Sequence, residues 1–290
     1  MKNIVKNYIR KTRIHNITNI LQIAKSIAIC NFLLYNKTIR NEWHYSNDNK
    51  NKMKIRENIK MKVCFNFWKG ENMVEISTSI LNVDEEEAMK TFYDLEVAKT
   101  DYYHIDVMDG KFVKKDTSCL MYSYASSIKQ MSNIPLDVHL MVKDVKEYIN
   151  QYIALEPHFV TIHYETLESK KQVKEMLQYI KENDIQCGLS IKPKTKVEEI
   201  YELLPYISLL LIMTVEPGKG GQELIPETVE KIRKVKEYIY QNNLETYVEA
   251  DGGINIENSK ELQDAGVDIM VVGSCIINSN DYKTQLAGAE

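Results

Sequence analysis

The sequence lacks the features of a disulfide-rich or membrane-spanning protein. Only five of its 290 residues are cysteines, and no two of them have C-x-x-C spacing. We therefore expect reduced thiols, with no disulfide framework and no zinc knuckle. The apolar run at residues 27–35 is far too short to cross a bilayer, so we expect no transmembrane segment.

Acidic residues are scarce at the N-terminus and abundant elsewhere. Residues 1–70 hold 15 Lys and Arg against 3 Asp and Glu, which gives this part a formal charge of +12. The remaining residues hold 22 Lys and Arg against 38 Asp and Glu, which gives a formal charge of −16. Such an acidic body argues against nucleic-acid binding. A phosphate would have to be held locally by backbone amides.

Residues 1–72 differ from the rest of the chain, being rich in Asn, Lys and Ile. One interpretation is a targeting leader, because a short apolar segment followed by an acid-poor basic stretch resembles an organellar leader, plastid-like or mitochondrial. The other is a disordered or wrongly assigned extension of a cytoplasmic protein, since Met61 and Met73 are both plausible starts. Both interpretations stay open.

From residue 73 onward, short apolar runs alternate with amphipathic helical patterns. The expected strands are 76–81, 103–107, 136–141, 159–163, 187–191, 209–213, 247–251 and 269–272. The expected helices are 84–99, 118–131, 145–156, 169–183, 197–203, 226–243 and 256–265. Eight β/α units in this length predict an α/β protein with one (β/α)8 TIM barrel over residues 73–290, preceded by the basic N-terminal extension.

Four polar residues occur at the ends of three predicted strands. His104 and Asp106 lie two apart and so face the same side of one strand, while His139 and Asp251 end two others. A lone strand-end histidine is more often a hydrogen-bonded core residue. In a (β/α)8 barrel, however, all four would face the same mouth, where two histidines and two carboxylates can bind one metal ion.

Glycine-rich turns follow the last three strands. They contain Gly218, Gly220 and Gly221, then Gly252 and Gly253, and finally Gly273 with Ser274. Glycine lets backbone N–H groups approach an anion closely, and such barrels often bind phosphate after their seventh and eighth strands. Each glycine pair taken alone could equally be a plain turn.

Several segments, in order, resemble the ribulose-phosphate 3-epimerase family. They are HIDVMDG at 104–110, DVHLMV at 137–142, GLSIKP at 188–193, MTVEPG at 213–218 with GGQ at 220–222, and ADGG at 250–253. The resemblance implies interconversion of D-ribulose 5-phosphate and D-xylulose 5-phosphate in the pentose phosphate pathway. It also implies help from a divalent ion, with zinc or iron(II) expected first and manganese or cobalt as further options. We expect a homo-oligomer as well.

The resemblance assigns roles to the four strand-end residues. Asp106 and Asp251 correspond to the acid/base pair, and both are also metal ligands beside His104 and His139. The chemistry explains the residue types, because removing a proton next to a carbonyl creates an enediolate, whose charge a metal ion can stabilise. Epimerisation then needs a proton carrier on each face of the sugar.

Further positions correspond to residues that contact the family's substrate. They are Ser79, Met108, His139, Met141, Met213, Gly218, Gly220, Gly221, Gly252, Gly253, Gly273 and Ser274. Ser79 could instead cap a turn, and the methionines could be ordinary core residues. His163 also matches the family, without an assigned role.

The chain departs from the family pattern in two places. Lys114 to Asp116 stand where the family usually has Pro-Asn, and Cys119 to Tyr122 follow where it has a Gly-Pro-Pro segment, which leaves the loop after the second strand in doubt. Lys219 replaces a phenylalanine, where it either assists phosphate binding or is simply solvated.

Three different functions compete with this assignment. A related six-carbon ketose-phosphate 3-epimerase would use the same four ligands. A catalytically silent phosphosugar-binding barrel would fit the altered loop and the unusual N-terminal extension, although the four ligand residues are intact. A phosphate-binding barrel that performs another reaction ranks last, because such barrels lack this arrangement of histidines and aspartates.

Overall fold

Eight parallel strands close into a barrel in the computed structural model, which describes residues 74–279 and 281–289. Each strand pairs with the next along the chain, and β8 pairs with β1. The strands are β1 (Glu75–Ser79), β2 (Tyr102–Met108), β3 (Leu136–Met141), β4 (Phe159–His163), β5 (Gln186–Ile191), β6 (Leu209–Met213), β7 (Tyr247–Asp251) and β8 (Ile269–Val272). The (β/α)8 fold expected from the sequence is therefore confirmed.

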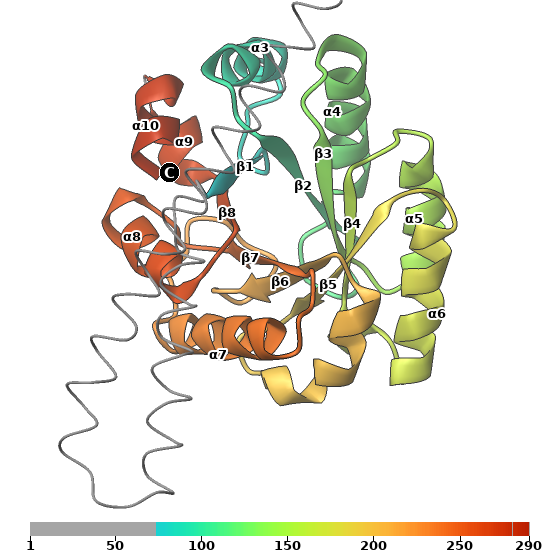
Figure 1. The fold of residues 1–290 in the computed structure, drawn as a ribbon. Coiled ribbons are helices and arrows are strands. Elements are labelled where there is room, and N and C mark those ends of the chain that lie inside the picture. Colours follow the sequence, from blue (N-terminus) through green and yellow to red (C-terminus); the bar gives the residue numbers. More distant parts are fainter. Residues whose placement is uncertain (1–73, 280, 290) are drawn as a thin grey trace, which may run out of the picture. The chain divides into compact units, whose positions relative to one another are not determined.

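Alpha-helices surround the barrel and follow every strand except β5 (Figure 1). They are α3 (Ala88–Ala98), α4 (Ser118–Met131), α5 (Val145–Ile153), α6 (Lys170–Lys181), α7 (Glu227–Gln241), α8 (Ile256–Ala265), α9 (Ser274–Ile277) and α10 (Tyr282–Ala289). A short 3-10 turn, η1 (Tyr164–Thr166), follows β4. The helix α10 packs against α3, so the end of the barrel chain lies beside its beginning.

Three predicted helices differ from the observed ones in type or by at least three residues at one end. The expected helix at 197–203 is replaced by two 3-10 helices, η2 (Val197–Glu199) and η3 (Tyr201–Tyr206), because Pro205 lacks an N–H group and disfavours α-helical backbone at the residue before it. The helix expected from residue 84 begins only at Ala88, since Asp84 forms a turn by accepting the N–H of Glu86. The third, α5, ends at Ile153 and so is three residues shorter than expected.

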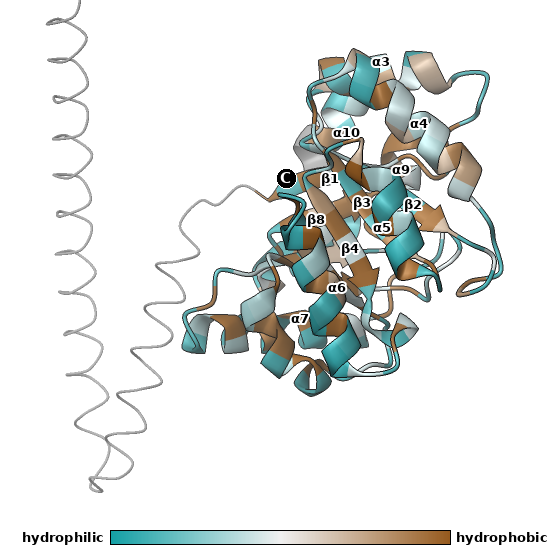
Figure 2. Cartoon of the chain, turned by 90° about the vertical axis from the view of Figure 1, so that its right-hand side faces the viewer, coloured by the Kyte–Doolittle hydropathy of each residue, from teal (hydrophilic) through white to brown (hydrophobic). Residues whose placement is uncertain are grey.

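The packing explains why these sequences form a barrel of strands surrounded by helices. On β2, Tyr103, Ile105 and Val107 belong to the main apolar core, whereas His104 and Asp106 are buried polar residues on the other face. Helices bring their own apolar faces to that core, and Figure 2 shows brown strands inside helices that also carry teal residues. The apolar core thus lies between barrel and helices, which leaves the barrel interior available for polar side chains.

The strand register places the polar residues of β2 and β3 side by side. His104 is opposite Asp137, and Asp106 is opposite His139. On the far side of the barrel, Asp251 of β7 is opposite Met213 of β6. Because all eight strands run in parallel, their carboxyl ends share one mouth.

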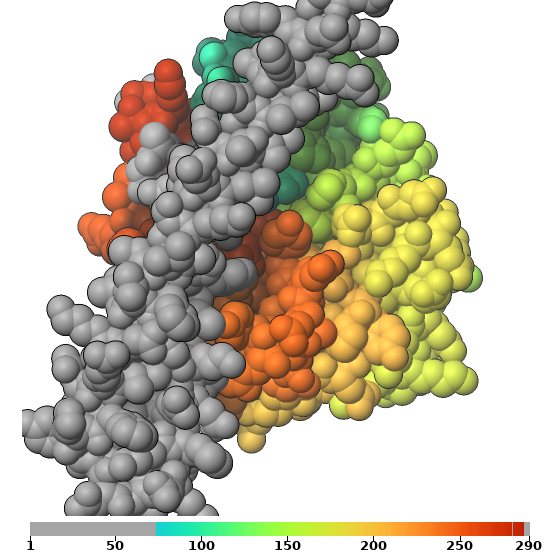
Figure 3. All heavy atoms as spheres, in the orientation of Figure 1, coloured from blue at the N-terminus to red at the C-terminus, as the bar shows by residue number. Residues whose placement is uncertain are grey.

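After β5, two 3-10 helices cover the outside of the barrel where the other strands are followed by an α-helix. In Figure 3 the pale orange atoms of η2 and η3 lie beside the orange atoms of α7, and η2 contacts α7 while η3 contacts α6. Within the described residues, no helix is both long and apolar enough to pass through a membrane. The predicted extension at 1–72 falls outside the described part of the chain.

Candidate active site

The four predicted ligand residues come together inside the barrel mouth. The Nε2 atom of His104 lies 3.4 Å from Oδ1 of Asp106, and Nδ1 of His139 lies 3.3 Å from the same oxygen. Nδ1 of His139 is also 3.7 Å from Oδ2 of Asp251. Each of the four offers one ligand atom, and these atoms all lie within 4.8 Å of one another. The structure therefore gathers, around one point, residues from three distant segments.

The donor atoms of this cluster fit a divalent metal ion. His104 Nε2 is fully buried and has no hydrogen-bond partner, although it lies close to the two aspartates. An orphaned buried nitrogen is costly unless something binds it. Two imidazole nitrogens with two carboxylate oxygens suit zinc or iron(II). The cluster can therefore hold a metal ion.

The two aspartates have opposite electrostatic environments. Burial alone would raise the pKa of Asp106, but the charges and hydrogen bonds of His104 and His139 outweigh it and hold that pKa far below its usual range. For Asp251, burial and the neighbouring charge of Asp106 raise the pKa to about 6. In the metal-free protein the two carboxyl groups thus differ in proton affinity, as is common for paired acids in active sites.

A second group of acidic residues, which was not predicted from the sequence, lies directly beneath the site. Asp137 contacts Nδ1 of His104, and Oε1 of Glu249 lies 3.9 Å from the same nitrogen. Both carboxyl groups are buried, and burial together with the charge of Asp137 raises the pKa of Glu249 well above its usual value. The sequence could have indicated both residues by their spacing. Asp137 lies two residues before His139, and Glu249 lies two before Asp251, so each shares a strand face with a proposed ligand.

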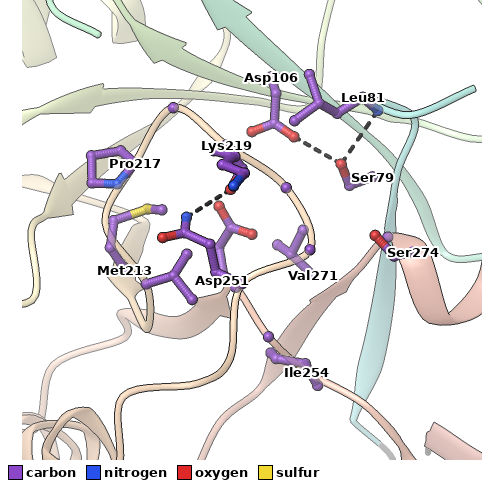
Figure 4. A pocket seen from close by; sticks show the side chains of 18 of the residues that line it. Ser79, Leu81, Asp106, Met213, Pro217, Lys219, Asp251, Ile254, Val271 and Ser274 are labelled. Carbon is purple, nitrogen blue, oxygen red and sulfur yellow. Dashed lines mark hydrogen bonds between the residues drawn. The ribbon is translucent and has the colours of Figure 1, made fainter. Parts of the chain in front are cut away.

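A pocket opens above the four residues, and its lining includes eleven of the twelve predicted substrate contacts. These eleven are Ser79, Met108, Met141, Met213, Gly218, Gly220, Gly221, Gly252, Gly253, Gly273 and Ser274. The twelfth, His139, is fully buried beneath the pocket. Figure 4 shows Asp106 and Asp251 entering the pocket from different strands, with Ser79 beside Asp106. Ser79 donates a 2.8 Å hydrogen bond to Asp106, so it also positions that carboxylate.

The glycine turns bring backbone close to the pocket, as a phosphate cradle requires. Gly253 has φ +69°, and a Cβ built there would lie 2.3 Å from the backbone nitrogen of Leu224. The loop after β6 is held together by the side-chain amide of Gln222, which donates to the carbonyl oxygens of Glu216 and Lys219. Lys219 is exposed at the pocket rim. The two loops therefore pack backbone against backbone, and only glycine fits at residue 253.

The loop after β2, which departs from the family pattern, is firmly anchored. Asp109 accepts hydrogen bonds from the backbone N–H groups of Lys111, Phe112 and Lys143. The side chain of Val113 packs against Gly218, where a Cβ would approach it to 2.8 Å. The altered loop thus reaches across to the β6 loop beside the pocket.

Sequence comparison identifies the family to which these features belong. The sequence model of the Ribulose-phosphate 3 epimerase family matches residues 75–277. The chain belongs to this family. Its members include the ribulose-phosphate 3-epimerase of Helicobacter pylori strain J99, which is 37% identical over 217 residues, covering 75% of this chain and 97% of that protein. The enzyme of the same name from Methanocaldococcus jannaschii is 32% identical over 212 residues, covering 73% of this chain and 88% of that protein. As a member of the epimerase family, the chain is a carbohydrate isomerase.

Solved structures confirm the fold independently of sequence. A 3-hexulose-6-phosphate synthase matches with a TM-score of 0.56 at 11% identity, covering 74% of this chain and 98% of that one. The enzyme of that name from Salmonella typhimurium matches with a TM-score of 0.53 at 15% identity, covering 74% of this chain and 96% of that one. At these identities the likeness extends to the barrel architecture and no further.

Proposed function

We propose that this chain interconverts D-ribulose 5-phosphate and D-xylulose 5-phosphate by moving the proton at C3 through an enediolate. The observation that carries the proposal is the pair of aspartates, Asp106 and Asp251, which enter one pocket from β2 and β7. That pocket also contains the glycine turns expected to hold a phosphate. The family's named activity agrees with this chemistry.

The two aspartates would divide the proton transfers between them. One carboxylate removes the C3 proton from its face of the sugar, and the carboxylic acid on the opposite side returns a proton to the other face. The roles exchange in the reverse direction. Ser79 holds Asp106 through its hydrogen bond and so fixes the direction from which that carboxylate approaches.

We further propose that one divalent ion, zinc or iron(II), is held by His104, Asp106, His139 and Asp251. Such an ion would stabilise the negative charge that develops on the sugar oxygens. The proposal is supported by the orphaned Nε2 of His104 and by the spacing of the four ligand atoms.

The remainder of the pocket would bind and orient the sugar phosphate. Backbone N–H groups of the turns after β6, β7 and β8 would hold the phosphate, since this end of the barrel is rich in glycine and the body as a whole is acidic. Met108, Met141 and Met213 line the pocket and would pack against the sugar.

Substrate turnover by the full-length chain tests the proposal. The chain, loaded with zinc or with iron(II) under anaerobic conditions, is supplied with D-ribulose 5-phosphate and, separately, with six-carbon ketose phosphates. We expect formation of D-xylulose 5-phosphate to be at least tenfold more efficient than any six-carbon reaction. Preference for a six-carbon substrate would replace the proposed substrate, and loaded protein without any epimerase activity would favour a silent sugar-phosphate-binding barrel.

A further inference from the structure

A chain of hydrogen bonds leads away from His139, starting at the ring nitrogen that does not face Asp106 and Asp251. The Nε2 atom of His139 lies 2.9 Å from Nε2 of His163. At the other nitrogen of that ring, Nδ1 of His163 lies 3.2 Å from Oε2 of Glu165. Both histidines are fully buried. The three residues thus form a continuous line from the four proposed ligand residues to the loop after β4.

The far end of this line is fixed as a hydrogen-bond acceptor. The second carboxylate oxygen of Glu165, Oε1, accepts the backbone N–H of Lys192, at 2.8 Å, and the hydroxyl of Thr195, at 2.5 Å. Burial would raise the pKa of Glu165, but these donors and His163 outweigh it and lower that pKa to about 2. Glu165 is therefore an ionised carboxylate, which can only accept hydrogen bonds.

The direction of every bond in the line follows from that end. Since Glu165 accepts, the Nδ1 atom of His163 must carry the hydrogen. The two Nε2 atoms, 2.9 Å apart, share one hydrogen, and a neutral His163 ring that donates from Nδ1 accepts at Nε2. The Nε2 atom of His139 must then donate, which leaves Nδ1 of His139 as the bare nitrogen facing the two aspartates.

We propose that His163 and Glu165 are positioning residues that hold His139 in the tautomer whose Nδ1 is free to bind the metal ion. The proposal rests on the metal site that forms part of the proposed function. Partners of metal-binding histidines commonly fix ring orientation and tautomer in this way. Here the partner is a second imidazole, backed by a carboxylate that the β5 loop holds in place.

The surroundings of His163 favour a fixed orientation. The ring of Phe112, from the loop after β2, has its centre 4.9 Å from the centre of the His163 ring. The ring centres of His163 and His139 are 5.0 Å apart. With aromatic rings packed against it and both nitrogens bonded, the buried His163 has little freedom to turn.

The Glu165→Gln variant should reverse the direction of hydrogen-bond donation between residue 165, His163 and His139. Lys192 N–H and the Thr195 hydroxyl both need an acceptor, so the amide oxygen stays with them and the NH₂ group turns toward His163. His163 Nδ1 then accepts, its Nε2 donates to His139, and the hydrogen of His139 moves to Nδ1, where a metal ion would bind. Glu168→Gln is the matched control, because Glu168 lies on the same loop away from this line.

Histidine tautomers can be read directly by long-range ¹H–¹⁵N NMR of the metal-free, full-length chain labelled at histidine. We expect His139 protonated at Nε2 and His163 at Nδ1 in the wild type and in Glu168→Gln, with both reversed in Glu165→Gln. A wild-type His139 protonated at Nδ1 would overturn the proposal, and this measurement requires no variant to fold.

Zinc affinity, measured by competition with a chelator, is the second readout. We expect Glu165→Gln to raise the dissociation constant for Zn²⁺ by about 10- to 100-fold, and Glu168→Gln to leave it unchanged. Equal affinity in Glu165→Gln and wild type would contradict a positioning role. Neither readout requires turnover, so the proposal can succeed even if the chain fails to epimerise D-ribulose 5-phosphate.

Discussion

His104 and Asp137, opposite each other on β2 and β3, are joined by a 2.5 Å contact between the imidazole Nδ1 and the carboxylate Oδ2. The same oxygen accepts a 2.8 Å hydrogen bond from the hydroxyl of Ser77. When His104 donates from Nδ1 to this carboxylate, its Nε2 faces the ligand cluster. Asp137 thus orients one proposed ligand from outside the cluster.

Replacing Asp137 with Asn should weaken metal binding without removing any ligand. An amide can offer its NH₂ group to Nδ1 and so allow the tautomer that blocks Nε2. We expect the dissociation constant for Zn²⁺ to rise about 10- to 100-fold, as measured by chelator competition. Ser77→Ala, which keeps the carboxylate, should have a smaller effect. Wild-type affinity in Asp137→Asn would show that this contact does not serve the metal.

The Asp106→Asn and Asp251→Asn variants should each lose most epimerase activity, because each removes the proton carrier of one face. General acid–base groups typically contribute roughly 10²- to 10⁴-fold, so we expect kcat to fall at least that far. Exchange of the C3 proton with deuterated solvent separates the two roles, since one variant should still exchange the proton of one epimer without inverting it. Turnover at the wild-type rate in either variant would refute the two-aspartate mechanism.

Removal of both ligand histidines should empty the metal site. We expect elemental analysis to find about one divalent ion per chain in the wild type and very little in the double variant His104→Ala/His139→Ala. His158→Ala, which changes an exposed histidine just before β4, is the matched control and should keep its metal. If the double variant were fully loaded, the ion would have to bind elsewhere.

Two glycine variants should separate steric conflict from backbone strain at the proposed phosphate site. Gly253→Ala places a Cβ 2.3 Å from the backbone of Leu224, so the β6 loop must shift, and we expect KM for the sugar phosphate to rise at least tenfold. Gly221→Ala meets no atom within 4 Å, and its φ of +70° should cost only about 1 kcal/mol of stability. Equal KM values for the two variants would argue against a backbone cradle around Gly253.

We propose that residues 73–290 are the catalytic part of the chain and that residues 1–72 are a separable extension. The first strand begins at Glu75, so deletion of residues 1–72 removes no barrel strand and no proposed ligand. We expect the shortened protein to keep kcat and KM within about twofold of the full chain, measured as formation of D-xylulose 5-phosphate from D-ribulose 5-phosphate. Insoluble or inactive shortened protein, beside active full-length protein, would show that the extension is needed for folding.

Targeting by the extension needs a separate experiment. A fluorescent reporter joined behind residues 1–72 should enter an organelle and lose the segment by cleavage if it is a leader. An uncleaved reporter spread through the cytosol would exclude targeting and leave the proposal about the barrel untouched.

The sequence alone determined the fold and the four clustered residues. Alternating apolar runs and amphipathic stretches have the periods of strand and helix, so strands such as Leu136–Met141 could be bounded correctly. Because parallel strands share one mouth in a barrel, polar residues at their ends had to meet there. Local geometry was harder, and the segment at 197–203 was wrongly predicted as an α-helix, since a short amphipathic pattern fits a 3-10 helix as well.

Only the tertiary structure decided which groups support that cluster. The link from His139 through His163 to Glu165, and onward to Lys192, joins β3, β4 and the loops after β4 and β5, and it depends on ring orientations. Likewise, the pairing of His104 with Asp137 follows from strand register, which no single strand specifies. Hydrogen-bond partners far apart in the chain depend on ångström-scale positions, whereas sequence periodicity fixes only the face on which each side chain lies.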